Sequence, residues 1–336
     1  MKRKGLLILL ILAILSFASC AKDDKEKYQE KGTKVEDVSK KLVAFKTGND
    51  IFLGQTSRAI ISGDYLLLCD YSSADKKIHL FDKNKLEYLT SIGDTGQGPG
   101  EIANMGNVYV NENSDKLYVT DFGHNCIYSF DIDSMLTEED YLPVIKYRLK
   151  GDFLPVDYVY VFDSLCYGTF VQYTDRKTVK RLTGKWNMKT GEVKLMEYVH
   201  PDVKNKQTNI VYSRLHDTLV EGHGCADLLS FFDGNLNLKY NVYGSDWNNG
   251  DGSKLNYYPM TIYKDYIITA YSGSSYSDYI LPTKLHVFTM DGNYYKTLEV
   301  GKRIHYLSSD EGNNRLFISF DDEIQFGYLD LKGILD

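Results

Sequence analysis

From about residue 42 onward, apolar and polar positions form short runs that are bounded by Gly, Asn, Asp and Ser. Runs of this length, rich in β-branched and aromatic residues, predict strands rather than helices. Residues 65–69 are followed by 78–82, and 117–121 by 127–131. Because short polar turns join consecutive runs, we expect antiparallel pairing. Only a short stretch near 133–140 has a helical pattern.

The strand pairs recur as a unit of roughly 40 to 50 residues, which is typical of a propeller blade. Six such units are recognisable near residues 60–93, 106–150, 156–199, 208–244, 257–300 and 301–332. The sequence therefore predicts an all-β fold, a six-bladed β-propeller of four-stranded antiparallel blades, with five or seven blades left open. The last unit lacks an outer strand. We expect residues 41–53 to supply it and so close the ring, which removes exposed sheet edges.

The N-terminus has the pattern of an export signal. Basic residues at 2–4 precede an apolar run over 6–15, too short for a transmembrane helix and suited to a signal peptide. Small residues then precede Cys20, an arrangement that resembles a bacterial lipobox, in which the thiol carries the lipid. We expect the membrane to be a partner through this lipid. A plain secretory signal with an incidental cysteine is the alternative.

Three segments are expected: a lipoprotein signal peptide over 1–19, a charged tether over 20–41 and a propeller domain over 42–336. The tether follows from composition, because a segment of mostly charged residues buries too little apolar area to order itself. Directly after Cys20, the run Lys22-Asp23-Asp24 resembles the signal that sends Bacteroidetes lipoproteins to the outer face of the outer membrane. Alternatively, this run is part of a linker that carries no sorting information, and the protein faces the periplasm.

A glycine-rich turn carries a family resemblance. Residues 92–101 read IGDTGQGPGE and lead into predicted strands at 107–110, 116–121 and 127–131. This stretch of about 40 residues resembles an NHL repeat. Together with the lipobox, it resembles the six-bladed, TolB-like propeller lipoproteins of Bacteroidetes. The resemblance implies a fold and an envelope location, but it implies no activity.

Composition narrows the function classes. The 336 residues include 39 Lys+Arg and 46 Asp+Glu, which gives a formal net charge of −7. An acidic chain lacks the basic footprint of a nucleic-acid binder, so no nucleic-acid partner is expected. Beyond Cys20, four cysteines lie far apart without a CxxC spacing, which argues against a zinc site.

No cofactor is expected. The glycines of residues 93–100 lack the Lys-Ser/Thr ending of a phosphate-binding loop, and no helix follows them as in a dinucleotide fold. Histidines of different blades can converge on a propeller axis and bind a metal ion there. His216 and His223 form the closest histidine cluster in the sequence, so they are the candidate metal ligands, with low probability. For both histidines, a role in the structure is favoured over metal binding.

Aromatic residues in polar loops are the candidate binding residues. Trp247 lies in a loop of Ser, Asp, Asn and Gly, while Tyr257, Tyr258 and Tyr276 belong to a Tyr/Ser-rich tract. Tyrosine and serine are typical of adaptable recognition surfaces. We therefore expect a module of the cell envelope that binds a protein or a glycan. The alternative is an envelope enzyme, a lyase or hydrolase, with its site at the channel mouth; the sequence singles out no catalytic residue.

Overall fold

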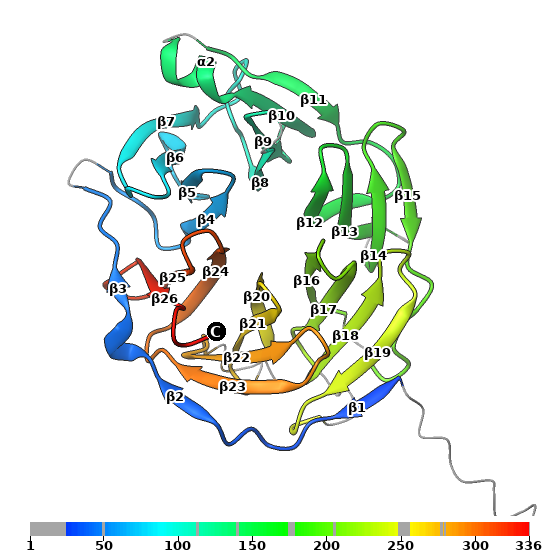
Figure 1. The fold of residues 1–336 in the computed structure, drawn as a ribbon. Helices are drawn as coiled ribbons and strands as arrows, with labels where there is room; N and C mark the ends of the chain where they lie inside the picture. Colours follow the sequence, from blue (N-terminus) through cyan, green and yellow to red (C-terminus); the bar gives the residue numbers. More distant parts are fainter. Residues whose placement is uncertain are drawn as a thin grey trace, which may run out of the picture.

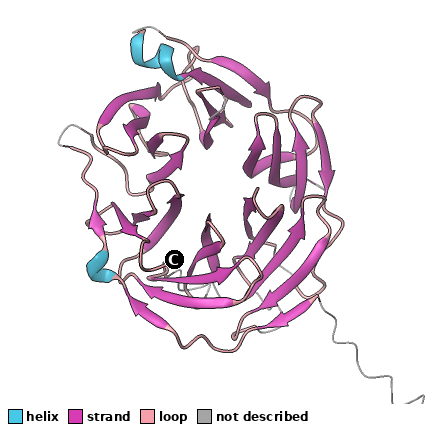
Figure 2. Cartoon of the chain, viewed as in Figure 1, coloured by secondary structure: helices cyan, strands magenta, loops and turns pink. Residues whose placement is uncertain are grey.

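The computed structural model describes residues 25–48, 51–111, 114–138, 141–173, 179–203, 206–247, 256–275, 278 and 280–335. These residues form six β-sheets arranged as blades in a ring (Figure 1). Figure 2 shows that strands dominate, with a short helix α2 (Ile132–Thr137) and one 3-10 turn (Ser39–Lys41) beside them. The predicted all-β, six-bladed propeller is confirmed.

Each blade follows the order of the chain, and its strands pair antiparallel. Blade 1 contains β4 (Arg58–Ser62), β5 (Tyr65–Cys69), β6 (Lys76–Asp82) and β7 (Tyr88–Asp94). Blade 2 contains β8 (Met105–Asn111), β9 (Lys116–Asp121), β10 (Cys126–Asp131) and β11 (Val144–Arg148). Blade 3 contains β12 (Leu154–Phe162), β13 (Leu165–Tyr173), β14 (Val179–Asn187) and β15 (Glu192–Leu195).

The second half of the ring repeats the plan. Blade 4 contains β16 (Thr208–Ser213), β17 (Thr218–His223), β18 (Leu228–Asp233) and β19 (Leu238–Tyr243). Blade 5 contains β20 (Tyr257–Tyr263), β21 (Tyr266–Tyr271), β22 (Lys284–Thr289) and β23 (Tyr294–Glu299). Blade 6 contains β24 (Ile304–Asp310), β25 (Arg315–Phe320) and β26 (Phe326–Asp330). The first strands of neighbouring blades contact one another, so these strands line the axis of the ring.

The hydrophobic core lies between the blades rather than at one centre. Each of six clusters of buried side chains joins two adjacent blades. The middle strands are buried on both faces, and every residue of β17 and β25 is buried. Burial on both faces explains why segments of middle strands, such as residues 65–69 and 316–318, are continuous apolar runs instead of alternating ones.

The last blade takes its outer strand from the segment that precedes blade 1. Strand β3 (Val43–Ala44) pairs antiparallel with β26, with Val43 opposite Tyr328 and Ala44 opposite Gly327. The backbone N–H of Phe45 continues the ladder by donating to the carbonyl of Phe326, at 2.9 Å. The expectation that residues 41–53 close the ring is confirmed.

The expected tether is corrected by the structure for residues 25–41, which we call the strap. Strand β1 (Glu26–Tyr28) pairs in parallel with β19, and β2 (Val35–Asp37) pairs in parallel with β23. Figure 1 shows the strap running along the outer edges of blades 4 and 5. The physical reason is that exposed edge strands offer unpaired backbone groups, which a charged segment can satisfy as well as an apolar one.

Side chains also hold the strap. Val38 is fully buried in the cluster between blades 5 and 6. The ammonium of Lys27 lies 3.7 Å from the ring centre of Tyr240, and Glu36 forms an ion pair of 3.0 Å with Lys296. The folded unit therefore includes the strap, whereas residues 1–24, with Cys20, lie outside the described residues. In the described part, no helix is both long and apolar enough to span a membrane.

Candidate functional site

The cavity with the most promising chemistry lies on the axis of the ring, and we call it the central cavity. Its volume is about 450 Å³, within the usual range of sites for small ligands. Residues near the beginnings of β4, β16, β20 and β24 line it, and Arg181 of β14 joins them. Four blades thus contribute their innermost strands to one opening, and a fifth contributes Arg181.

Arg58, the first residue of β4, is the charged centre of this cavity. Its guanidinium carbon lies 4.7 Å from the ring centre of Tyr71 and 5.0 Å from that of Tyr306. These aromatic contacts hold the cation by attraction to the ring faces. Its Nε is buried without a hydrogen-bond partner, and among the described residues Arg58 forms no ion pair. The charge is therefore fixed in place but is not neutralised by a close carboxylate.

The half-buried carboxyl group of Asp157, on β12, interacts electrostatically with Arg58. Asn107 donates a hydrogen bond to Asp157 from Nδ2 to Oδ1, at 2.9 Å. Burial raises the pKa of Asp157, while Asn107 and Arg58 oppose the rise. Asp157 does not line the central cavity, so a ligand in the cavity meets Arg58 first.

Two further polar atoms at the central cavity have no partner. They are Nε2 of His305 and Oδ1 of Asn209, both buried. Burial and the charge of Arg58 lower the pKa of His305, so its ring is neutral at neutral pH. Of the six buried side-chain N or O atoms left without a partner among the described residues, three therefore line this one cavity. An unmet buried polar group costs about 1–3 kcal/mol, so such a concentration indicates a place where a ligand or water supplies the bonds.

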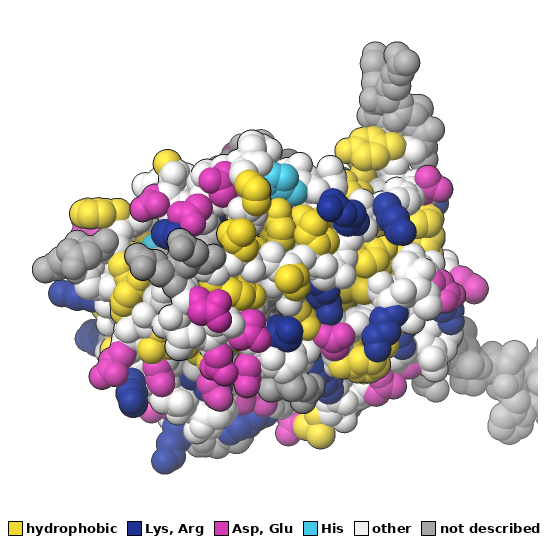
Figure 3. Space-filling view, turned by 90° about the horizontal axis from the view of Figure 1, so that it is seen from above, with side chains coloured by type: hydrophobic (Ala, Val, Ile, Leu, Met, Phe, Trp, Pro, Cys, Tyr) yellow, Lys and Arg dark blue, Asp and Glu magenta, His cyan; other side chains and the backbone are white. Residues whose placement is uncertain are grey.

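One side of the ring has a mixed surface. Figure 3 shows one side of the ring, on which acidic and basic side chains are interspersed with hydrophobic patches. The central cavity, by contrast, is lined by two arginines and by no acidic residue of the described chain. Its local charge is opposite in sign to the net charge of the whole protein.

The Tyr-rich tract contributes one residue to the central cavity. Tyr258 lines the cavity and is 48% exposed. Its neighbour Tyr257 is buried, and its hydroxyl donates to Oδ1 of Asp227 at 2.5 Å. Successive residues of a strand point to opposite faces, which explains why only one of the pair reaches the opening. Tyr276 lies outside the described residues.

Trp247 packs against the protein instead of standing free in its loop. Its ring centre lies 4.9 Å from that of Tyr243 and 5.4 Å from that of His200. It is part of a small cluster with Leu228 near the edge of blade 4. The structure thus separates Trp247 from the central cavity and gives it a packing role.

The two histidines considered as metal ligands are not brought together. His223 is the last residue of β17, which is six residues long, whereas His216 lies in the turn before this strand. The strand between them spans about 17 Å at the usual rise per residue. Nε2 of His216 lies 2.8 Å from Oδ1 of Asp265 near the surface, whereas His223 is buried with Nε2 3.2 Å from Oγ of Ser230. Across the described ranges, no group of three or more His, Cys, Asp or Glu side chains is placed to hold a metal ion.

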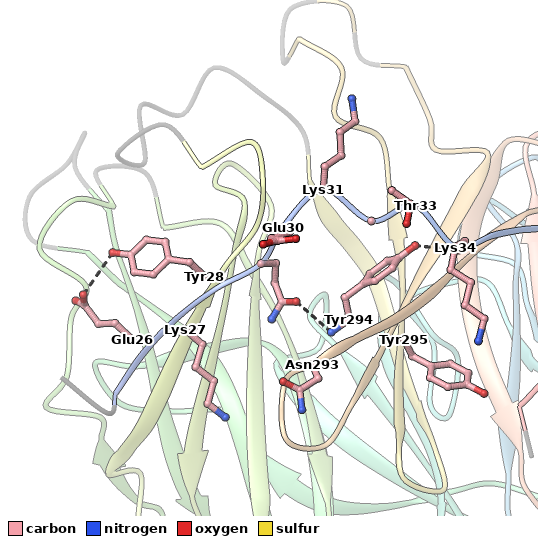
Figure 4. Close-up of a pocket in the computed structure, with 12 residues that line it drawn as sticks. Glu26, Lys27, Tyr28, Glu30, Lys31, Thr33, Lys34, Asn293, Tyr294 and Tyr295 are labelled. Carbon is pink, nitrogen blue, oxygen red and sulfur yellow. Dashed lines mark hydrogen bonds between the residues drawn. The ribbon is translucent and has the colours of Figure 1, made fainter. Parts of the chain in front are cut away.

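A second, larger cavity of about 700 Å³ lies beneath the strap (Figure 4). Its walls are residues 26–34 of the strap and Asn293, Tyr294 and Tyr295 at the start of β23. Tyr294 points toward the strap, where its hydroxyl donates to the carbonyl of Lys34 at 3.0 Å and its N–H donates to Oε1 of Gln29 at 3.2 Å. These polar contacts are made within the protein, so we interpret this cavity as the crevice left where the strap crosses from blade 4 to blade 5.

Comparison with known proteins supports the fold. A member of the DUF4221 family from Bacteroides vulgatus superposes with a TM-score of 0.63 and 16% identity, covering 89% of this chain and 98% of that one. A protein of Bacteroides fragilis whose name describes it as exported gives a TM-score of 0.56 and 10% identity, covering 88% of each chain. At these identities the likeness concerns the fold alone. No curated protein sequence matches the chain.

A family model described as "DUF5128: 6-bladed beta-propeller" matches residues 23–215. The matched region is more than half of the chain, and it includes the strap and the first three blades. Together with six blades in the structure, this match shows that the protein belongs to the DUF5128 family of six-bladed β-propellers.

Proposed function

We propose that the protein is a lipid-anchored binding module of the cell envelope, whose protein or glycan ligand enters the central cavity. The observation that carries the proposal is that three residues lining one cavity, Arg58, Asn209 and His305, each have a buried side-chain atom without a hydrogen-bond partner. A propeller is well suited to this role, because a rigid ring holds residues of different blades around one site.

The proposed location is the outer membrane, with the propeller on the cell surface. Support comes from the lipobox-like residues before Cys20, from the Lys22-Asp23-Asp24 run, and from the resemblance to NHL and TolB-like lipoproteins. The similarity to a Bacteroides fragilis protein named as exported agrees with it. A lipid at Cys20 would hold an otherwise water-soluble ring at the membrane.

Binding is tested with glycan and peptide arrays probed by the purified protein. Tyr258→Ala should remove most of the signal of a bound probe. Tyr88→Ala is the matched control, because Tyr88 is 49% exposed but lies on the outer strand of blade 1. A probe that binds both variants equally well would place the binding site elsewhere and contradict the proposal.

Location is tested by digesting intact cells with a protease that cannot cross the outer membrane. Digestion of the wild-type protein without lysis is expected, together with release of a Cys20→Ala variant from the membrane fraction. Protection until lysis would mean that the protein faces the periplasm, and membrane retention of Cys20→Ala would rule out the lipid anchor.

A further inference from the structure

We infer that the ligand of the central cavity is an acidic sugar, a hexuronic acid unit whose carboxylate binds between Arg58 and Arg181. The inference rests on the proposed function and gives that site a ligand class. Three independent features carry it: the charge of the lining, the fixed geometry of Arg58, and the unpartnered atoms beside it.

The charge of the lining selects an anion. Arg58 and Arg181 are the charged residues among the described ones that line the central cavity, and no Asp or Glu accompanies them. The whole chain has a formal net charge of −7, so chance would favour an acidic opening. A concave site lined by one sign of charge concentrates ligands of the opposite sign.

The geometry of Arg58 selects a planar anion such as a carboxylate. Contacts with Tyr71 and Tyr306 fix the guanidinium, and its buried Nε has no acceptor. An arginine presents parallel N–H donors that match two carboxylate oxygens. Arg58 lines the cavity and forms no ion pair among the described residues, so a bound carboxylate would supply the missing opposite charge. Arg181, exposed on β14, adds a second positive charge at the rim.

The neighbouring atoms favour a sugar over an acidic peptide side chain. Oδ1 of Asn209 is an acceptor without a donor, and Nε2 of His305 is a second unpartnered atom. Sugar hydroxyls both donate and accept, so one ring can satisfy both atoms. Tyr258 offers a half-exposed aromatic face, and such a face packs well against the C–H side of a sugar ring. An aspartate or glutamate side chain would satisfy the arginines alone.

The experiment is titration calorimetry of the purified full chain with three probes: trigalacturonic acid, neutral galactotriose and an acidic tetrapeptide. Trigalacturonic acid should bind, and more weakly as salt is raised, while galactotriose should bind at least about tenfold more weakly, as expected for the loss of a charge-assisted hydrogen bond. Equal binding of the acidic and neutral sugars would overturn the inference and leave the proposed function intact. Binding of the tetrapeptide alone would replace the glycan by a protein ligand. If none of the three probes binds, the inference is overturned. If the glycan and peptide arrays also show no binding, the proposed function is contradicted as well.

Variants locate the effect. Arg181→Gln should weaken binding of trigalacturonic acid by about tenfold or more without unfolding the protein, since this side chain is at the surface. Asn209→Asp adds a negative charge with nearly the same shape, so it should weaken binding of the acidic probe more than that of the neutral one. Arg214→Gln is the control. Asn209 lies near the beginning of β16, whereas Arg214 lies just after the end of this strand, in the turn between β16 and β17. If Arg214→Gln lost as much affinity as Arg181→Gln, the effect would come from the overall charge of the protein, and the proposed site would be contradicted.

Discussion

The backbone of Val43 pairs with that of Tyr328, so a segment that precedes blade 1 forms the outer strand of the last blade. No covalent bond is needed for this closure. The short strand β3 is reinforced by Phe45, whose side chain packs between blades 6 and 1 with Phe81, Phe317 and Phe326. The short ladder and the aromatic cluster therefore act together with direct contacts between blades 6 and 1, such as the hydrogen bond from Ala59 N–H to Ser319 Oγ at 2.8 Å.

Phe45→Ala should destabilise the protein strongly. Phe45 is 9% exposed, and its ring centre lies 5.4 Å from that of Phe81 in an edge-on contact. Removing a buried phenylalanine leaves a cavity and costs about 3–5 kcal/mol. Urea denaturation measures the free energy of unfolding. Phe52→Ala is the control, because Phe52 is 88% exposed and should change stability by less than about 0.5 kcal/mol. Equal effects of both variants would contradict the role of Phe45 in closure.

The strap should be released by a charge placed at Val38. This residue is fully buried between blades 5 and 6, while Val35, on the same strap, is 59% exposed. Val38→Asp buries a carboxylate without a partner, which is costly, whereas Val35→Asp leaves it in water. Limited trypsin digestion with mass spectrometry should show faster cleavage after Lys31 and Lys34 in Val38→Asp only. If both variants are cut at the wild-type rate, Val38 does not hold the strap.

The strap also shows where sequence reasoning reached its limit. The strands and the closing segment were predictable, because turn residues and apolar runs mark them directly. Pairing of residues 26–28 and 35–37 with blade edges uses backbone groups, which leave no side-chain pattern, and the charged composition pointed to a tether instead. The edge strands β19 and β23 supplied the missing partners.

The central cavity was predictable only in part. Tyr258 was predictable from the sequence because it lies in a Tyr-rich tract. Successive side chains of a strand point to opposite faces, so its neighbour Tyr257 does not reach the cavity. Arg58, Asn209 and His305 come from three blades and are far apart in the sequence, so no local spacing links them. Only closure of the ring brings their strands together at one face.

Trp247→Ala should lower stability without changing ligand binding. The indole packs against Tyr243 and His200 at the edge of blade 4, away from the central cavity. Loss of a partly buried aromatic contact costs about 1–3 kcal/mol. Thermal unfolding and calorimetry with the same probes separate the two effects, and Trp247→Phe should restore part of the stability. If Trp247→Ala lowered the affinity for the probe and left the stability unchanged, Trp247 would be part of the binding surface and the prediction would be wrong.

The stability of the protein should fall on mild acidification because of His223. Burial, helped by the charges of Lys206 and His200 and opposed by that of Glu221, lowers the pKa of this side chain to about 4. The closest polar groups are Oγ of Ser230, 3.2 Å from Nε2, and Oε2 of Glu221, 3.9 Å from Nε2. In the unfolded chain the imidazole takes up its proton near its ordinary pKa of 6.5. Between these two pH values the unfolded state therefore binds more protons, and stability decreases as the pH falls.

The test compares the free energy of unfolding of wild type and His223→Gln from pH 7 to pH 5. Glutamine keeps a polar group beside Ser230 and does not titrate, so its curve should be flatter. At about 1.4 kcal/mol per pH unit for one proton, the two curves should approach each other by about 2 kcal/mol over this range. Glu221 has a pKa lowered below its ordinary value, so its protonation falls outside the window. Curves of equal slope for the wild type and His223→Gln would contradict the linkage.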